Sequence, residues 1–223
     1  MIRRELLGTA HVPGGEDLLL YRHDRDFMIV MGHNELMSSR MSGSEIELAT
    51  RTCARLAGRP APRLLIGGYG MGFTLRAALG ALGKDARIVV AELVREIILW
   101  ARGPMEELAA GCLDDPRVNL LYGDVAEAIG VAEGEYDAIL LDVDNGPDGL
   151  VRPANNKIYS MRGLRSAMAA LKPGGILAVW SAAPDKAFAM RLREVGFAVD
   201  EVQVAARSNG KGPKHTIWFA TRQ

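Results

Sequence analysis

The stretch that decides the fold is residues 64–75, which read LLIGGYGMGFTL. Its apolar start predicts a short buried strand, and the helical pattern resumes near Phe73. Between them, Gly68, Gly70 and Gly72 allow a tight turn whose backbone approaches a ligand closely. The helix that follows points its free amide groups at the same place. The spacing G-x-G-x-G differs from the dinucleotide pattern G-x-G-x-x-G, and it also fits a plain strand–helix turn.

Outward from this stretch, strands and helices alternate along residues 58–223. The strands are nearly continuous apolar runs, which is typical of a parallel sheet covered on both faces. We predict seven strands, near residues 63–66, 87–91, 116–122, 136–143, 176–181, 197–206 and 215–221. The last two strands are joined by a glycine-rich turn, so one of them is expected to run antiparallel. The fold class is therefore α/β: a doubly wound, mostly parallel, Rossmann-like sheet with an antiparallel C-terminal strand.

Residues 1–57 have a different pattern and form a separate unit in this prediction. Apolar runs at 18–21 and 27–31 predict a β-hairpin or a small antiparallel sheet. Residues 44–47, Ser-Glu-Ile-Glu, fit a capping box that starts a linking helix ending near Ala57. The breaker-rich segment 58–62 then leads into the main domain, residues 58–223.

Acidic residues follow three successive strands of the predicted sheet. Glu92 ends the second strand 20 residues after Gly72, the position at which nucleoside-binding folds place a carboxylate for the ribose hydroxyls. Asp124 ends the third strand and could accept a hydrogen bond from an adenine amino group. Asp142 and Asp144 end the fourth, where a carboxylate could take a proton from an amine. Each acid alone also fits a helix cap or a solvated turn.

Together these residues resemble the class I S-adenosylmethionine-dependent transferases, and within that fold the spermidine synthase group. The resemblance is carried by residues 65–76, 115–124, 136–142 and 171–175. It implies S-adenosylmethionine or its decarboxylated form as co-substrate, bound by Gly68, Gly70, Gly72, Glu92 and Asp124. It also implies Asp142 and Asp144 as catalytic acids, Glu47 in the substrate site, and a homodimer. Tyr159, where the chain returns from the fourth-strand loop, could close over the acceptor or simply pack.

Some positions depart from the family's pattern. Met71 stands where the family has an acid for the donor's amine, and Asn145 where it has a second catalytic acid. Three functions therefore stay open. The first is aminopropyl transfer from decarboxylated S-adenosylmethionine to an amine. The second is methylation of a small-molecule nucleophile, which the loss at Met71 favours. The third is nucleoside binding without catalysis.

Composition narrows the classes of protein and of partner that remain possible. The chain has 223 residues, 48% of them hydrophobic, so it can bury a core and is not disordered. Its 27 basic and 27 acidic residues give a formal net charge of zero, which argues against nucleic acid as a partner. No membrane span or secretory signal is evident, and a cytoplasmic location is expected. Cys53 and Cys112 fit buried apolar positions, and no metal site is predicted.

Overall fold

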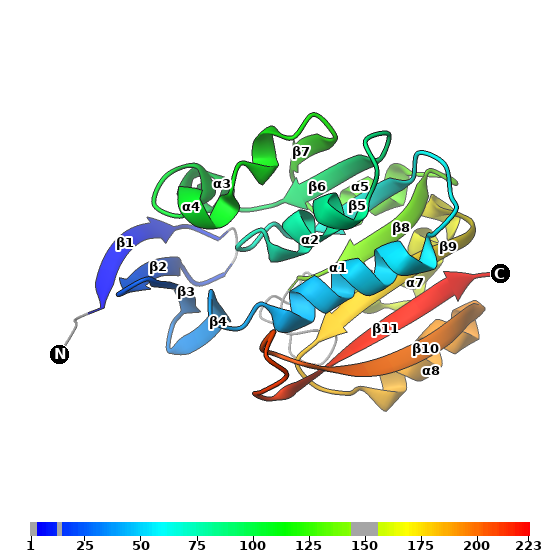
Figure 1. Cartoon of the computed structure of the whole chain (residues 1–223). Coiled ribbons are helices and arrows are strands. Elements are labelled where there is room, and N and C mark those ends of the chain that lie inside the picture. Colours follow the sequence, from blue (N-terminus) through cyan, green and yellow to red (C-terminus); the bar gives the residue numbers. More distant parts are fainter. Residues whose placement is uncertain (1–3, 13–14, 144–155) are drawn as a thin grey trace.

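The chain forms two sheets that lie next to each other (Figure 1). They are seen in a computed structural model, which describes residues 4–12, 15–143 and 156–223. The smaller sheet is antiparallel, with its strands in chain order: β1 (Glu5–Ala10), β2 (Leu18–His23), β3 (Asp26–Met31) and β4 (Asn34–Ser38). The predicted hairpin is thus the centre of a larger sheet. Its outer strands were missed because Gly8 interrupts β1 and β4 begins with polar residues.

The larger sheet has seven strands in the order β10-β11-β9-β8-β5-β6-β7. The strands are β5 (Arg63–Gly67), β6 (Arg87–Glu92), β7 (Val118–Tyr122), β8 (Tyr136–Leu141), β9 (Leu171–Ser181), β10 (Phe197–Ala205) and β11 (Lys214–Arg222). Strands β5 to β9 are parallel, and β11 runs antiparallel to both of its neighbours. The predicted fold class is confirmed. β9 begins earlier than expected because Leu171 already pairs with Tyr136, and an irregularity in the pairing follows.

Helices cover both faces of the larger sheet (Figure 1). They are α1 (Gly43–Arg55), α2 (Phe73–Ala81), α3 (Arg95–Arg102), α4 (Glu106–Ala109), α5 (Val125–Val131), α6 (Asn156–Tyr159), α7 (Met161–Ala170) and α8 (Lys186–Val195). The helical pattern near 94–112, for which a break near Gly103 and Pro104 is expected, is divided at Gly103, and a 3-10 turn, Cys112–Asp114, follows α4. The short helix α5 was not predicted. It begins directly after Asp124, whose carboxylate caps it.

Strand β5 shows how the sequence fills two cores. Successive side chains of a strand point to opposite faces. Leu64 and Ile66 pack into the core that includes α1, α2 and α3, whereas Leu65 packs into the core that includes α5, α7 and α8. The linking helix α1 therefore packs on the larger sheet, against α2 and β9. Cys53 and Cys112 are buried free thiols, as predicted.

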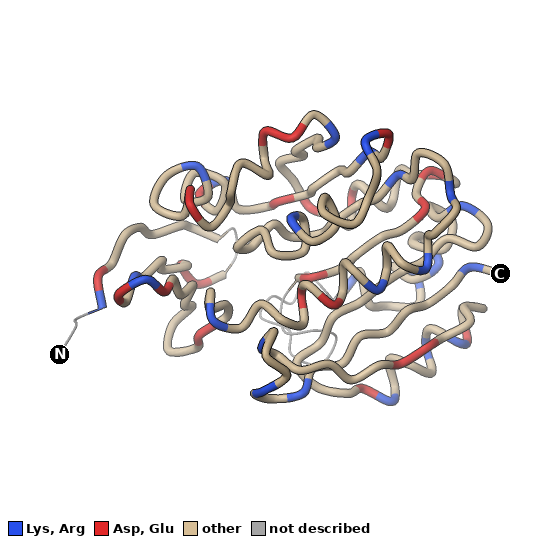
Figure 2. Tube along the Cα trace, viewed as in Figure 1, with Lys and Arg blue, Asp and Glu red and all other residues tan. Residues whose placement is uncertain are grey.

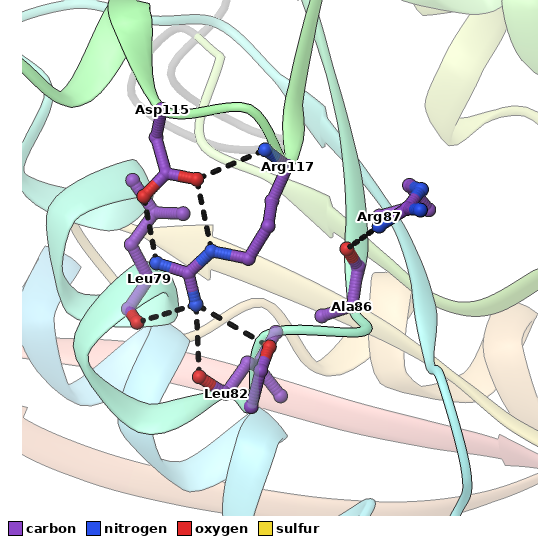
Figure 3. Close-up of polar contacts among 7 residues, drawn as sticks. Leu79, Leu82, Ala86, Arg87, Asp115 and Arg117 are labelled. Atoms are coloured by element: carbon purple, nitrogen blue, oxygen red, sulfur yellow. Dashed lines mark hydrogen bonds and ion pairs between the residues drawn. The ribbon is translucent and has the colours of Figure 1, made fainter.

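Part of the stretch that carries the family resemblance has a structural role. Arg117 donates to the carbonyl oxygens of Leu79 at 3.1 Å and Leu82 at 2.9 Å, which lie at the end of α2 (Figure 3). The same guanidinium forms two hydrogen bonds with Asp115, at 2.9 and 2.8 Å. A cation at the C-terminus of a helix satisfies carbonyls that have no partner within the helix. Arg117 thus fixes the end of α2, whose first turn follows the glycine loop.

Candidate active site

A cavity of about 300 Å³ lies at the carboxyl ends of β5, β6, β7 and β8. In an open α/β sheet this edge is where ligands bind. Five of the predicted site residues line it: Gly68, Gly70, Glu92, Asp124 and Asp142. The smaller sheet forms the opposite wall with apolar side chains, among them Leu18, Ile29, Met31, Leu36 and Met37. The structure therefore brings the strand-end acids together and faces them with an apolar surface.

The glycine loop has the backbone that its sequence predicts. Gly68 has a φ of +83°, and a Cβ there would lie 2.8 Å from the carbonyl oxygen of Asp142. Gly70 has a φ of +55°, and its Cβ would lie 2.5 Å from the Met37 methyl group. Any side chain at either position would be strained and would enter occupied space. Gly72 is the N-cap of α2 and does not line the cavity.

Glu92 holds the loop in place from the end of β6. Its two carboxylate oxygens accept backbone hydrogen bonds from Tyr69 and Val94, each at 2.8 Å. Burial raises the pKa of Glu92, against the lowering effect of these amide donors. Glu92 also lines the cavity, where its carboxylate is placed to accept a hydrogen bond from a ligand hydroxyl.

Asp124 combines two of the roles considered for it. One oxygen, Oδ1, accepts from the amide of Ala126 at 2.8 Å and caps α5. The residue also lines the cavity, next to Gly123. The cap fixes the orientation of the carboxylate at the cavity wall.

Asp142 and an acid that the sequence analysis did not select, Glu45, lie in the same part of the cavity. Thr74 donates to Oδ2 of Asp142 at 2.8 Å. Burial raises the pKa of Asp142 to about 6, although the bond from Thr74 opposes the shift. Burial, and next the negative charge of Asp142, raise the pKa of Glu45 to about 8. With these pKa values Glu45 keeps its proton at neutral pH while Asp142 is ionised, and a cation bound beside the pair would favour ionisation of both.

Ser44 and His215 complete this group of side chains. Ser44 Oγ donates to Glu45 Oε2 at 2.6 Å and lies 2.9 Å from His215 Nδ1. The predicted capping box at 44–47 is therefore wrong: the N-cap is Ser42, and Ser44 and Glu45 are buried. The sequence contains a pattern that indicates the burial of Glu45. Glu45 precedes Leu48, Ala49 and Thr52 at helical spacing, which puts an acid on the buried face of α1.

Glu47 and Tyr159 do not line the cavity. Glu47 forms an ion pair with Arg51 on the same helix, and its side chain is 40% exposed and does not line the cavity. Tyr159 is buried, packs edge-on against Phe188 and donates to the carbonyl of Val143 at 3.2 Å. The packing role, one of the two considered for Tyr159, is the one that these contacts show.

The other expected positions fall into two groups. Asp144 and Asn145 lie outside the described residues. Met71 is 2% exposed and packs in the core beside α2 instead of lining the cavity. Among the residues that the structure describes, no cluster of three or more histidine, cysteine or acidic side chains is placed to hold a metal ion.

The raised pKa of Glu45 predicts how stability depends on pH. A folded protein that holds a proton more tightly than its unfolded chain loses stability as pH rises. For Glu45 the loss runs from about pH 4.5 to about pH 8, between the ordinary carboxyl pKa and the raised one. We expect Glu45→Gln to reduce the fall in Tm over this range, as measured by thermal melts.

Glu47→Gln is the matched control for this prediction. Glu47 lies two residues away on the same helix, is exposed and faces Arg51. Its variant is expected to keep the pH dependence of the wild-type protein. An unchanged slope in Glu45→Gln would show that Glu45 has an ordinary pKa in the folded protein.

Comparison with known proteins agrees with this geometry. The model of the spermine/spermidine synthase domain matches residues 55–192, which is more than half of the chain. This chain belongs to the spermine/spermidine synthase family. The match begins at the end of α1 and includes the glycine loop, Glu92, Asp124 and Asp142. No helix among the described residues is long and apolar enough to span a membrane.

Individual relatives match only part of their own length. A polyamine aminopropyltransferase of Nitrosomonas europaea is 35% identical over 127 residues, which are 57% of this chain and 37% of the relative. Polyamine aminopropyltransferase 2 of Pseudomonas aeruginosa is 30% identical over 164 residues, 71% of this chain and 44% of the relative. A crystal structure of spermidine synthase from Thermotoga maritima superposes with a TM-score of 0.77 at 18% identity, covering 98% of this chain and 73% of that one. The likeness to this structure shows the shared fold.

Proposed function

We propose that the protein transfers an aminopropyl group from decarboxylated S-adenosylmethionine to a small-molecule amine. One observation carries the proposal. The described residues that line the cavity include five acids and neither lysine nor arginine: Glu35, Glu45, Glu92, Asp124 and Asp142. A bound cation favours the ionised form of such buried acids, whereas an anion would meet like charge, so the cavity suits cations. The decarboxylated donor and an amine are both cationic, whereas intact S-adenosylmethionine would bring a carboxylate that finds no cation in this lining.

The methionine at position 71, which favoured methylation, is weaker evidence for that function once its place in the structure is known. The side chain at position 71 points into the core, so it does not subtract an acid from the cavity wall as the structure describes it. Glu45, at the start of α1, supplies a carboxylate there instead. The cavity thus keeps its acidic character despite the changes in the family's motifs.

For this reaction the protein must orient the donor and the amine and accept one proton. Gly68, Gly70, Glu92 and Asp124 would hold the nucleoside part of the donor. The sulfonium supplies an already activated carbon, which the amine nitrogen attacks in line with the departing thioether. A C–N bond forms, the C–S bond breaks, and neutral methylthioadenosine leaves. Asp142 receives the proton that the attacking nitrogen gives up.

The direct test is product analysis. The protein is incubated with decarboxylated S-adenosylmethionine and a panel of amines, and products are identified by mass spectrometry. We expect an amine enlarged by one aminopropyl group, together with methylthioadenosine. A methylated product formed from intact S-adenosylmethionine would instead identify a methyltransferase, and nucleoside binding without any product would identify a binding protein.

We also propose, from the family membership, that the protein acts as a homodimer in the cytoplasm. Two exposed apolar side chains support a surface for self-association: Leu6 of β1 is 51% exposed and Leu99 of α3 is 65% exposed. These two elements contact each other. Acidic and basic positions are interspersed along the described part of the chain (Figure 2), and the formal net charge of zero argues against nucleic acid as a partner.

A further inference from the structure

Two buried polar atoms beside the acidic group have no hydrogen-bond partner among the described residues: Trp180 Nε1 and Ser38 Oγ. Both residues line the cavity, and they are 8% and 4% exposed. The contrast within the same sheet is Trp218, whose indole nitrogen donates to Glu201 at 3.0 Å. A buried indole N–H without a partner lowers stability, and a ligand atom that accepts from it would remove this cost.

The indole N–H of Trp180 limits which kind of ligand atom can be its partner. An indole N–H only donates, and an ammonium group also only donates. The ammonium groups and methylenes of a diamine therefore cannot accept a hydrogen bond from Trp180, and the one neutral nitrogen that reacts directs its lone pair at the donor carbon. The expected partner carries a lone pair, as an oxygen does. Trp180 ends β9 and neighbours β8 on the side away from β5, β6 and β7. It is thus separated from Glu92 and Asp124, the acids assigned to the nucleoside.

His215, at the start of β11, offers the complementary group. Ser44 has one hydroxyl proton and donates it to Glu45, and in this arrangement the nearby Nδ1 of His215 is the donor to Ser44. Burial lowers the pKa of His215 and favours the neutral ring. Its Nε2 then carries a lone pair and can accept. The ring lies edge-on to Trp180, with 4.8 Å between ring centroids, and His215 also lines the cavity.

We propose that this part of the cavity binds a hydroxyl group of the acceptor, which makes the acceptor an amino alcohol. The hydroxyl oxygen accepts from Trp180 Nε1, and its proton is donated to His215 Nε2. The amine lies toward Glu45 and Asp142. This inference rests on the proposed function only in that an amine is the acceptor.

A diamine satisfies fewer of these groups. Glu35 also lines the cavity and could pair with a second ammonium, but it is exposed at the beginning of β4. A diamine that reached Glu35 would leave the Trp180 donor without a partner. Ser38, at the end of β4, can donate or accept and does not discriminate between the two ligands.

The test compares ligands that differ only in the hydroxyl group. Calorimetry measures the affinity of the full-length protein for 4-aminobutan-1-ol, butylamine and 1,4-diaminobutane, with and without methylthioadenosine. We expect the amino alcohol to bind about three- to tenfold more tightly than butylamine, as one good hydrogen bond predicts. Trp180→Phe, which keeps an aromatic ring but removes the N–H, is expected to abolish this preference.

Thr216→Val is the matched control. Thr216 Oγ1 is also buried without a partner among the described residues, but Thr216 does not line the cavity, so its variant should keep the preference. His215→Leu provides a second variant that should lose it, should Trp180→Phe fail to fold. A wild-type protein with no preference, or a preference that survives in both variants, would overturn the inference.

The outcomes separate this inference from the proposed function. Aminopropyl transfer to diamines without any hydroxyl preference would refute the hydroxyl subsite alone. A hydroxyl preference that depends on Trp180, in a protein that forms no aminopropyl product, would support the subsite and refute the proposed reaction.

Discussion

Replacing Asp142 with asparagine is expected to lower kcat by roughly 10²- to 10⁴-fold, the range for loss of a positioned proton acceptor. Asp142 lies in the cavity at the end of β8, and its pKa of about 6 suits a group that must accept a proton near neutral pH. Asparagine has almost the same shape and keeps an oxygen for the bond from Thr74, but it cannot take the proton. Steady-state kinetics with decarboxylated S-adenosylmethionine measures the effect.

The accompanying binding and stability measurements separate catalysis from folding. Donor affinity should change far less than kcat, because the nucleoside is assigned to Gly68, Gly70, Glu92 and Asp124. The Tm of the variant should be equal to or above that of the wild-type protein, since a buried charge with a raised pKa is removed. A kcat within threefold of wild type would exclude Asp142 as the proton acceptor.

The second large effect concerns stability and involves Asp137 at the start of β8. Its side chain is 5% exposed and accepts from Lys172 Nζ at 2.7 Å, from the Arg63 amide at 2.8 Å and from Arg59 Nη1 at 2.9 Å. Burial opposes ionisation, but these three donors outweigh it and lower the pKa of Asp137. We expect Asp137→Asn to reduce the free energy of unfolding by roughly 2 to 4 kcal/mol, as chemical denaturation would measure it.

The expected loss of unfolding free energy in Asp137→Asn is smaller than for a fully buried ion pair because the cationic partners of Asp137 reach solvent. The side chains of Lys172 and Arg59 are 39% and 28% exposed, so water can replace part of the interaction with Asp137 that they lose in the variant. Asp200→Asn is the matched control, because Asp200 also forms an ion pair, with Arg55, but is 59% exposed. Its variant should lose about 1 kcal/mol or less. Equal losses in the two variants would contradict the account.

The lowered pKa of Asp137 also gives the direction of its pH effect. A carboxyl group that ionises more readily in the folded state stabilises the protein above its unfolded pKa, near 4. That contribution is lost as pH falls further, through the folded pKa. The difference in stability between wild type and Asp137→Asn should therefore shrink in acid. This is opposite to the Glu45 effect, which weakens the protein as pH rises.

The sequence predicts the central layout of this site because three of the predicted acids stand at the ends of parallel strands. The carboxyl ends of parallel strands share one edge of the sheet, so Glu92, Asp124 and Asp142 had to converge once the strands were recognised. The glycines at 68 and 70 were readable for a similar reason, since they directly follow the strand that fixes their place. Local pattern and global fold agree in this part of the chain.

That the remaining site residues meet could not be predicted from local pattern. Glu45, Trp180 and His215 come from α1, β9 and β11, and their meeting depends on how these elements pack. The serine and glutamate at 44–47 fitted a helix cap equally well, so the capping interpretation concealed a buried acid. Glu47 was selected by its position in the family's motif, and the turn of α1 directs it to Arg51 instead.

The account's central claim is that an acidic cavity selects a donor without a carboxylate. Calorimetric titration of the full-length protein with decarboxylated S-adenosylmethionine, and separately with S-adenosylmethionine, tests it most directly. We predict clear preference for the decarboxylated donor, by about tenfold or more, corresponding to about 1.4 kcal/mol or more. Equal affinity, or preference for intact S-adenosylmethionine, would contradict the claim and favour methyl transfer on this scaffold.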